Sequence, residues 1–270
     1  LTGYYDGYCF EKTATVRVMN PWSVMSFLIY PTRGFRDHWF QTGGQPSVLK
    51  DLFRSGALKD PKNFAAVKTI PFSQLGGPAI GENFSEVDLL TQTGYLTFKS
   101  VDGNIAIVDY STEEVRHAMA GMYLHQLVGK TIEQAGVMDF AIRLVKDNPE
   151  TLVRIFNRLL ESVDYEAYSI EDAKSVLAVI QIAMINVRLS PVIKVIAKGE
   201  SVLEVQAGER TIVLTLEYCH PDQEAEQLLQ VAVSQLDKPF SGKLGGRMEI
   251  LKLVLVFSES DRRITVWSVA

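Results

Sequence analysis

The spacing of apolar residues changes character near residue 166. Apolar residues first recur every three or four positions between Ala173 and Val187, which predicts one buried helix face. Shorter apolar runs follow, separated by glycine or proline, which is typical of strands. The predicted order is helix, three strands, helix, strand, strand, and it favours an α/β sandwich on a mixed sheet. After the first helix these elements span residues 192–196, 201–206, 211–219, 222–236, 250–257 and 263–269.

Residues 111–165 are predicted to form a helical connector. Apolar positions from Leu152 to Val163 follow a helical repeat. Ser111 and Glu114 form a capping-box pattern ahead of Val115, and Ser169 with Asp172 predicts the start of the next helix in the same way. Both starts are therefore expected at the serine.

Residues 1–110 mix short helical patterns with a hairpin. Asn20-Pro21 predicts a helix start ahead of the apolar run 22–28, with Trp22 expected in the core. Further short helices are predicted at 47–53 and 86–90. Strands at 94–98 and 105–110 flank the turn signal Asp102-Gly103, so a winged-helix-like unit is favoured. The predicted domains are 1–110, 111–165 and 166–270.

Composition places the chain among soluble globular proteins. It has 270 residues, 47% of them hydrophobic and 22% charged, with a net charge of −5, so there is no overall basic signature of a nucleic-acid binder. With two cysteines, Cys9 and Cys219, we expect a reduced, cytoplasmic setting and no membrane partner. Because the chain begins at Leu1 and not at methionine, we expect it to be part of a longer protein.

Four short strings occur in the order of a known family. The chain resembles the AAA-ATPase-like proteins that carry a C-terminal PD-(D/E)XK nuclease-like domain. The resemblance implies that the chain is the part after an ATPase core, and nothing in it matches the phosphate-binding loop that such a core needs. The strings are Tyr5-Asp6-Gly7-Tyr8 with Asn20-Pro21-Trp22-Ser23-Val24, Trp39-Phe40-Gln41-Thr42-Gly43, Gly94-Tyr95-Leu96-Thr97, and Glu114-Val115.

The resemblance also implies where a nuclease site would lie. The family's fold supplies a helix Glu, a strand Asp and a Glu-x-Lys pair on the next strand, and its carboxylates hold Mg²⁺. Glu217 fits the family's Glu, whereas Val202 stands at the Asp position and Cys219 at the Lys position. Glu171 fits the helix Glu, and Gln230 fits a Gln often found in the following helix.

Valine cannot ligate a cation, and a cysteine gives no fixed positive charge. The leading prediction is therefore a catalytically degenerate nuclease-like domain that acts as a binding or regulatory module, with no cofactor expected and DNA or another protein as partner.

Basic residues near the C-terminus are predicted to cluster on solvated loops: Lys238, Lys243, Arg247, Arg262 and Arg263.

Two alternatives stay open. An active nuclease that uses Mg²⁺ or Mn²⁺ would combine Glu217 with Glu200 or Glu204, which flank Val202 on its strand face. Lys194 or Lys198 would then replace the missing lysine. The second alternative is a protein–protein interaction fragment without contact to nucleic acid, which the net acidity favours.

Overall fold

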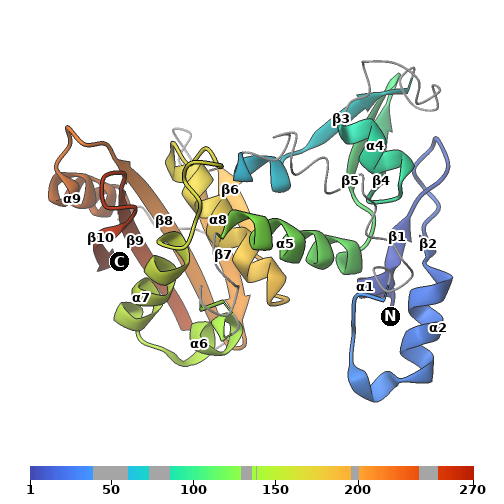
Figure 1. Cartoon of the computed structure of the whole chain (residues 1–270), viewed down its shortest axis with the longest axis horizontal. Coiled ribbons are helices and arrows are strands. Elements are labelled where there is room, and N and C mark those ends of the chain that lie inside the picture. Colours follow the sequence, from blue (N-terminus) through green and yellow to red (C-terminus); the bar gives the residue numbers. More distant parts are fainter. Residues whose placement is uncertain (39–59, 73–85, 129–135, 138, 196–200, 237–248) are drawn as a thin grey trace. The chain divides into compact units, whose positions relative to one another are not determined.

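A computed structural model describes residues 1–38, 60–72, 86–128, 136–137, 139–195, 201–236 and 249–270 (Figure 1). The chain divides into two compact units. Unit 1 comprises residues 1–58 and 65–119, and unit 2 comprises residues 59–64 and 120–270. The fold is mixed α+β, which confirms the coarse prediction. Within the described residues, each helix is too short or too polar to cross a bilayer.

Unit 1 combines short helices with two small antiparallel sheets. One sheet pairs β1 with β2, and the other has the strand order β3-β5-β4. The elements are α1 (Thr2–Tyr5), β1 (Asp6–Tyr8), β2 (Val18–Met19), α2 (Pro21–Ile29), η1 (Pro31–Arg33), β3 (Lys68–Pro71), α4 (Glu86–Gln92), β4 (Leu96–Asp102), β5 (Ile105–Tyr110) and the first part of α5 (Glu113–Leu127).

The hairpin of unit 1 forms where its turn signal predicts it. Gly103 has a φ of +57°, which glycine adopts without strain, and β4 and β5 pair on either side of it. The helix predicted at 86–90 is confirmed as α4. The strand β3 was not predicted, because its Lys-Thr-Ile-Pro sequence is too short to show an alternating pattern. The helix predicted at 47–53 lies outside the described residues.

The start of α2 is confirmed, but its apolar run is not a core face. The Asn20 side chain accepts a hydrogen bond from the Trp22 amide at 3.0 Å. Trp22 and Met25 are more than half exposed, so the prediction of Trp22 in the core is wrong. The fully buried residue of α2 is Ser23 instead. Its hydroxyl donates a 2.9 Å hydrogen bond to the buried Glu114 carboxylate.

That contact explains why the capping box predicted at Ser111 is wrong. α5 begins at Glu113, and the Thr112 hydroxyl accepts the cap hydrogen bond from the Val115 amide at 3.2 Å. Glu114 points into the interior of unit 1 toward Ser23, not back toward the helix start. A long-range contact has therefore replaced the local one.

Unit 2 is built on a five-stranded mixed sheet packed with helices (Figure 1). The strand order is β10-β9-β8-β7-β6; β8 and β9 run parallel, and the other neighbours are antiparallel. The predicted element order is confirmed. The elements are η3 (Pro61–Phe64), α6 (Phe140–Lys146), α7 (Pro149–Leu160), α8 (Ala173–Asn186), β6 (Val192–Val195), β7 (Ser201–Ala207), β8 (Arg210–Cys219), α9 (Ala225–Leu236), β9 (Glu249–Ser258) and β10 (Arg263–Val269).

Two contacts in unit 2 join segments that are far apart in the sequence. Phe64 of η3 is buried against Tyr123 of α5, with ring centroids 5.9 Å apart, so residues 59–64 belong to unit 2 although unit 1 residues surround them in sequence. Asn157 of α7 bonds the backbone of Ile264 in β10. The predicted domain boundaries near 110 and 165 stay predictions.

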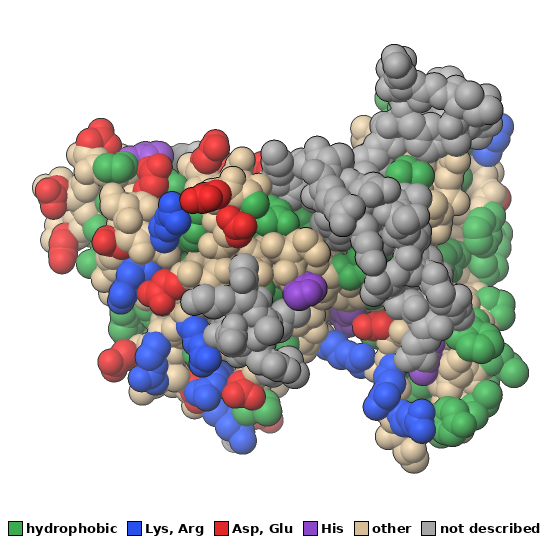
Figure 2. All heavy atoms as spheres, in the orientation of Figure 1, with side chains coloured by type: hydrophobic (Ala, Val, Ile, Leu, Met, Phe, Trp, Pro, Cys, Tyr) green, Lys and Arg blue, Asp and Glu red, His purple; other side chains and the backbone are tan. Residues whose placement is uncertain are grey.

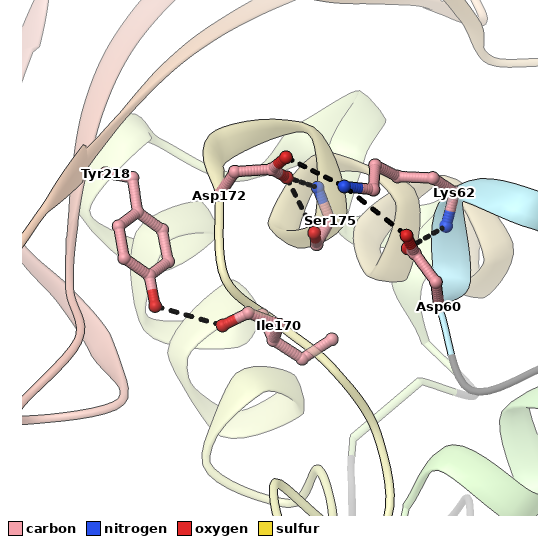
Figure 3. Close-up of polar contacts among 6 residues, drawn as sticks. All are labelled: Asp60, Lys62, Ile170, Asp172, Ser175 and Tyr218. Atoms are coloured by element: carbon pink, nitrogen blue, oxygen red, sulfur yellow. Dashed lines mark hydrogen bonds and ion pairs between the residues drawn. The ribbon is translucent and has the colours of Figure 1, made fainter.

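The N-terminus of α8 is capped by Asp172, so the prediction of Ser169 as the cap is wrong. The Asp172 carboxylate accepts hydrogen bonds from the Ser175 amide at 2.8 Å and the Ser175 hydroxyl at 2.6 Å (Figure 3). It also accepts a 2.8 Å bond from the Lys62 ammonium group, which lies 3.3 Å from Asp60 as well. Burial raises the pKa of Asp172, but the bonds from Lys62 and Ser175 outweigh burial and hold that pKa below its usual value.

Replacing Asp172 with alanine is expected to lower the free energy of unfolding of unit 2 by about 1–2 kcal/mol, because α8 loses its cap and Lys62 loses a partner. The variant Asp172→Asn keeps the cap acceptor and loses only the charge, so most of the stability is expected to remain. Urea denaturation of both variants measures this. Equal losses in the two would contradict the cap as the main contribution.

Candidate functional site

The register of the large sheet brings five of the predicted positions onto one face. Val202 of β7 pairs with Thr215 of β8, and Glu204 pairs with Val213. Directly paired residues share a face, and faces alternate along a strand. Glu217 and Cys219, two and four residues beyond Thr215, therefore lie on the face of Val202 and Glu204. Lys194 of β6 pairs with Val202 and lies there too. We call Lys194, Val202, Glu204, Glu217 and Cys219 the sheet-face site.

Two members of the sheet-face site are apolar or neutral. Val202 is 1% exposed. Cys219 is also buried, and its thiol donates to the carbonyl oxygens of Gln223 at 3.4 Å and His220 at 3.6 Å. Burial raises the pKa of the Cys219 thiol, and nearby carboxylates, with Glu224 foremost, raise it further. Cys219 is therefore a neutral thiol at pH 7 and supplies no positive charge to a phosphate.

The charged members of the site partly neutralise one another. The Lys194 ammonium group lies 2.6 Å from the Glu204 carboxylate. Lys194 thus lies where the hypothesis of an active nuclease with displaced ligands requires a lysine. However, it contacts Glu204, the carboxylate that would have to bind the metal in that hypothesis. Glu200 and Lys198, the other displaced candidates, lie outside the described residues.

The remaining two predicted residues do not join this face. Glu171 precedes the cap residue Asp172 and lies outside helix α8, not within it. The neighbouring Ile170 carbonyl accepts a 2.9 Å hydrogen bond from the Tyr218 hydroxyl (Figure 3), and Tyr218 leaves β8 on the opposite face from Glu217. Gln230 is an exposed residue of α9. The structure therefore separates Glu171 from Glu217.

A cavity of about 630 Å³ lies at the carboxyl ends of the parallel strands β8 and β9. Aromatic rings form part of its wall: Tyr218 and Phe257 have centroids 5.5 Å apart, and Tyr165 stacks on Phe257. Glu171 and Glu259 also line it. We call it the Tyr218 cavity. With Glu166, the lining has three carboxylates against the one guanidinium group of Arg262, so the charged residues described there sum to −2.

Tyr218 is expected to ionise at unusually high pH. Burial, with a smaller contribution from Glu259 and Glu171, raises the pKa of Tyr218 to about 12. Because the folded pKa is raised above the unfolded value near 10, Tyr218 contributes stability that is complete below pH 10 and is lost as the pH rises toward 12. The difference in absorbance at 295 nm between the wild type and Tyr218→Phe measures this titration. A midpoint near 10 would contradict it.

The family-like strings of unit 1 meet inside that unit. The Ser23 hydroxyl bonds Glu114, and the Asn20 amide donates to the Tyr5 carbonyl at 3.4 Å. The Thr97 hydroxyl bonds the amide and the carbonyl of Cys9 at 2.8 and 2.9 Å, directly after Tyr8. These contacts are structural, because they join buried backbone and side-chain groups. The string 39–43 lies outside the described residues.

Sequence reasoning missed the arginines of α6 and α7. Arg143, Arg154 and Arg158 line one cavity of about 430 Å³. A usable signal was present: Thr151, Arg154 and Arg158 stand at i, i+3 and i+7, which places them on one helix face. The sequence predicted a basic cluster near the C-terminus instead. Of its members, Arg262 and Arg263 are described, and Lys238, Lys243 and Arg247 lie outside the described residues.

Within the described residues, no group of three or more His, Cys, Asp or Glu side chains is arranged to hold a metal ion. The sheet-face site offers two carboxylates on one face, one of which is already paired with a lysine. Such a set can bind a polar partner or a weakly held cation. Comparisons with protein-family models, with curated proteins and with solved structures find no match to this chain.

Proposed function

We propose that unit 2 is a binding or regulatory module on a PD-(D/E)XK-like scaffold, in which the nuclease chemistry has been lost. The observation that carries the proposal is the environment of Val202. It is buried beside Thr215, on the face that also bears Glu217, where the family resemblance calls for a metal-binding Asp. An isopropyl group there excludes a cation and its water shell from the centre of the site.

The other positions support the same conclusion. Magnesium prefers an octahedral shell of oxygen ligands, usually with carboxylates from the protein. Among the described residues, the carboxylate that shares this face with Glu217 is that of Glu204. Lys194 neutralises the charge of Glu204. Cys219 stays a thiol at neutral pH and cannot stabilise charge on a phosphate. Unit 1 then serves as the winged-helix-like lid region of an AAA-ATPase-like protein, as the motif resemblance implies.

A second candidate is a nuclease with displaced ligands. The observation in its favour is that Glu204 and Glu217 share a face with Lys194. For this candidate, the Lys194–Glu204 ion pair has to open when the metal binds. An exposed pair of this kind is stabilised by only about 0–1 kcal/mol, so the cost is small.

One experiment separates the two. We expect no saturable Mn²⁺ binding to the full chain by calorimetry and no cleavage of plasmid or single-stranded DNA with Mg²⁺ or Mn²⁺. Val202→Asp places a carboxylate on the same sheet face as Glu217 and is expected to introduce Mn²⁺ binding, with circular dichroism to verify folding.

The control is Glu226→Ala, which removes an exposed carboxylate from α9. Metal-dependent cleavage by the wild type that Glu217→Ala abolishes and Glu226→Ala preserves would overturn the proposed function and establish the displaced-ligand nuclease.

A further inference from the structure

Basic side chains gather on the surface of α6 and α7 in unit 2, although the chain carries a net charge of −5. Figure 2 shows lysine and arginine side chains over these two helices, with carboxylates scattered among them. The concentration is local. It coincides with the cavity of about 430 Å³ between α6 and α7, which we call the arginine cavity.

Of the residues described in the lining of the arginine cavity, three carry guanidinium groups and one carries a carboxylate. Arg143 comes from α6, and Arg154 and Arg158 come from successive turns of α7. The carboxylate is Asp139, 3.8 Å from Arg143. The charged residues described in its lining therefore sum to three positive charges minus one negative, or +2. Like charges around one concavity repel, and an anion bound there would relieve that repulsion.

The three arginines are held in different ways. Arg143 lies 3.2 Å from Asp147 as well as 3.8 Å from Asp139, so two carboxylates fix its position. The Arg154 guanidinium donates to the Thr151 hydroxyl at 3.3 Å, a neutral acceptor that leaves its charge uncompensated by this contact. Thr151 also lines the cavity and offers a hydroxyl to a ligand.

Gly136 places the stem of Arg158 against the backbone. Its φ is +76°, a conformation that favours glycine, and a Cβ added there would lie 2.9 Å from Cδ of Arg158. The side chain of Arg158 therefore passes directly over Gly136. A side chain at position 136 would require the end of the Arg158 side chain to shift.

We propose that the arginine cavity binds the phosphate group of a small phosphorylated molecule. Guanidinium groups bind phosphate with paired, charge-assisted hydrogen bonds, and three of them surround one space here. A volume of about 430 Å³ lies within the range of small-molecule sites and leaves room for more than the phosphate itself. Ile155 gives the wall an apolar portion for the rest of the ligand. This site does not depend on the proposed function, because it lies on α6 and α7 and not at the sheet-face site.

The test is calorimetric titration of the full chain with inorganic pyrophosphate and, separately, with O-phosphoserine. Saturable binding of at least one probe is expected, and the tighter probe assigns the ligand as a polyphosphate or a monoester. Arg154→Gln and Arg158→Gln are each expected to weaken binding by about tenfold. Arg154→Lys keeps the charge but loses the paired donors, so it is expected to bind less tightly than the wild type.

The matched control is Arg262→Gln, which removes the same charge from a guanidinium that lies 4.9 Å from the centroid of the Tyr165 ring. Its affinity for the probe is expected to equal that of the wild type. The absence of saturable binding of both probes overturns the proposal. Equal weakening by Arg154→Gln and Arg262→Gln also overturns it, because it would reveal a general charge effect and not a site. Circular dichroism of Arg154→Gln checks the fold, which is expected to be unchanged because Arg154 is exposed.

Discussion

Replacing Gly7 with alanine is expected to destabilise unit 1 by about 3 kcal/mol or more. Gly7 has a φ of +145°, which L side chains rarely adopt. A Cβ on Gly7 would lie 2.1 Å from the backbone oxygen of Ser111. The obstacle is backbone and not the end of a flexible side chain, so β1 or the start of α5 has to move.

The loss of stability in Gly7→Ala should extend to the buried residues around Gly7. The adjacent Tyr8 and the following Cys9 are both buried, and the Cys9 backbone is bonded to Thr97 of β4. Hydrogen exchange in residues 4–9 and 95–111, measured by mass spectrometry, reports on this region directly. Faster exchange is expected there, while exchange in β7 and β8 of unit 2 should change little.

Gly3→Ala provides the matched control for this substitution. Gly3 lies in α1, and a Cβ added there would meet no atom within 4 Å. Alanine is also the better helix former, so a neutral or slightly stabilising effect is expected. If Gly7→Ala exchanged like Gly3→Ala, the close approach between Gly7 and Ser111 would not be a feature of the folded protein.

Local signals predicted much of the fold because they need only neighbouring residues. The turn at Asp102-Gly103 is such a case, since a positive φ at glycine and two flanking strands specify a hairpin. The element order of unit 2 follows from changes in apolar period, from helical in α8 to strand-like in β7 and β8. The mixed sheet then follows from its connections, because a helix separates the parallel pair β8 and β9.

The errors arise where a distant residue changes a local preference. Ser111 and Thr112 both have the side chain of a helix cap, and Glu114 decides between them by bonding Ser23, which is 91 residues away in sequence. Lys62 contacts Asp172 across 110 residues, so no local pattern assigns residues 59–64 to unit 2. Trp22 has the composition of a core residue and is exposed all the same.

For the candidate site, the strand period predicts part of the arrangement. Glu204 shares the face of Val202 because the two positions are two residues apart along the strand. That Glu217 and Cys219 join them depends on the register of β7 with β8, which no sequence pattern states. Glu171 was assigned to the site because the resemblance implied a helix Glu and the helix was expected to start at Ser169. The actual cap at Asp172 leaves Glu171 in the preceding segment, on the side of Tyr218.

Asn157→Ala is expected to lower the free energy of unfolding of unit 2 by about 2–3 kcal/mol. β10 is an edge strand of the sheet, and Asn157 of α7 bonds both backbone groups of Ile264 within it. The side-chain amide donates to the Ile264 carbonyl at 2.9 Å, and its oxygen accepts from the Ile264 amide at 2.6 Å. Asn157 thus takes the place of a neighbouring strand at this point.

Alanine would leave a buried donor and a buried acceptor without these bonds, and an unmade buried hydrogen bond costs more than a made one contributes. The edge of β10 would also be open to pairing with another chain, so concentration-dependent association is expected along with lower stability. Glu161→Ala is the control: it removes an exposed ion pair, 3.6 Å from Arg263 at the same α7–β10 contact, and should cost less than about 1 kcal/mol. Urea denaturation and sedimentation velocity measure the two effects. A loss in Asn157→Ala no greater than in Glu161→Ala would mean that water satisfies Ile264 as well as Asn157 does, and that α7 holds β10 by apolar packing alone.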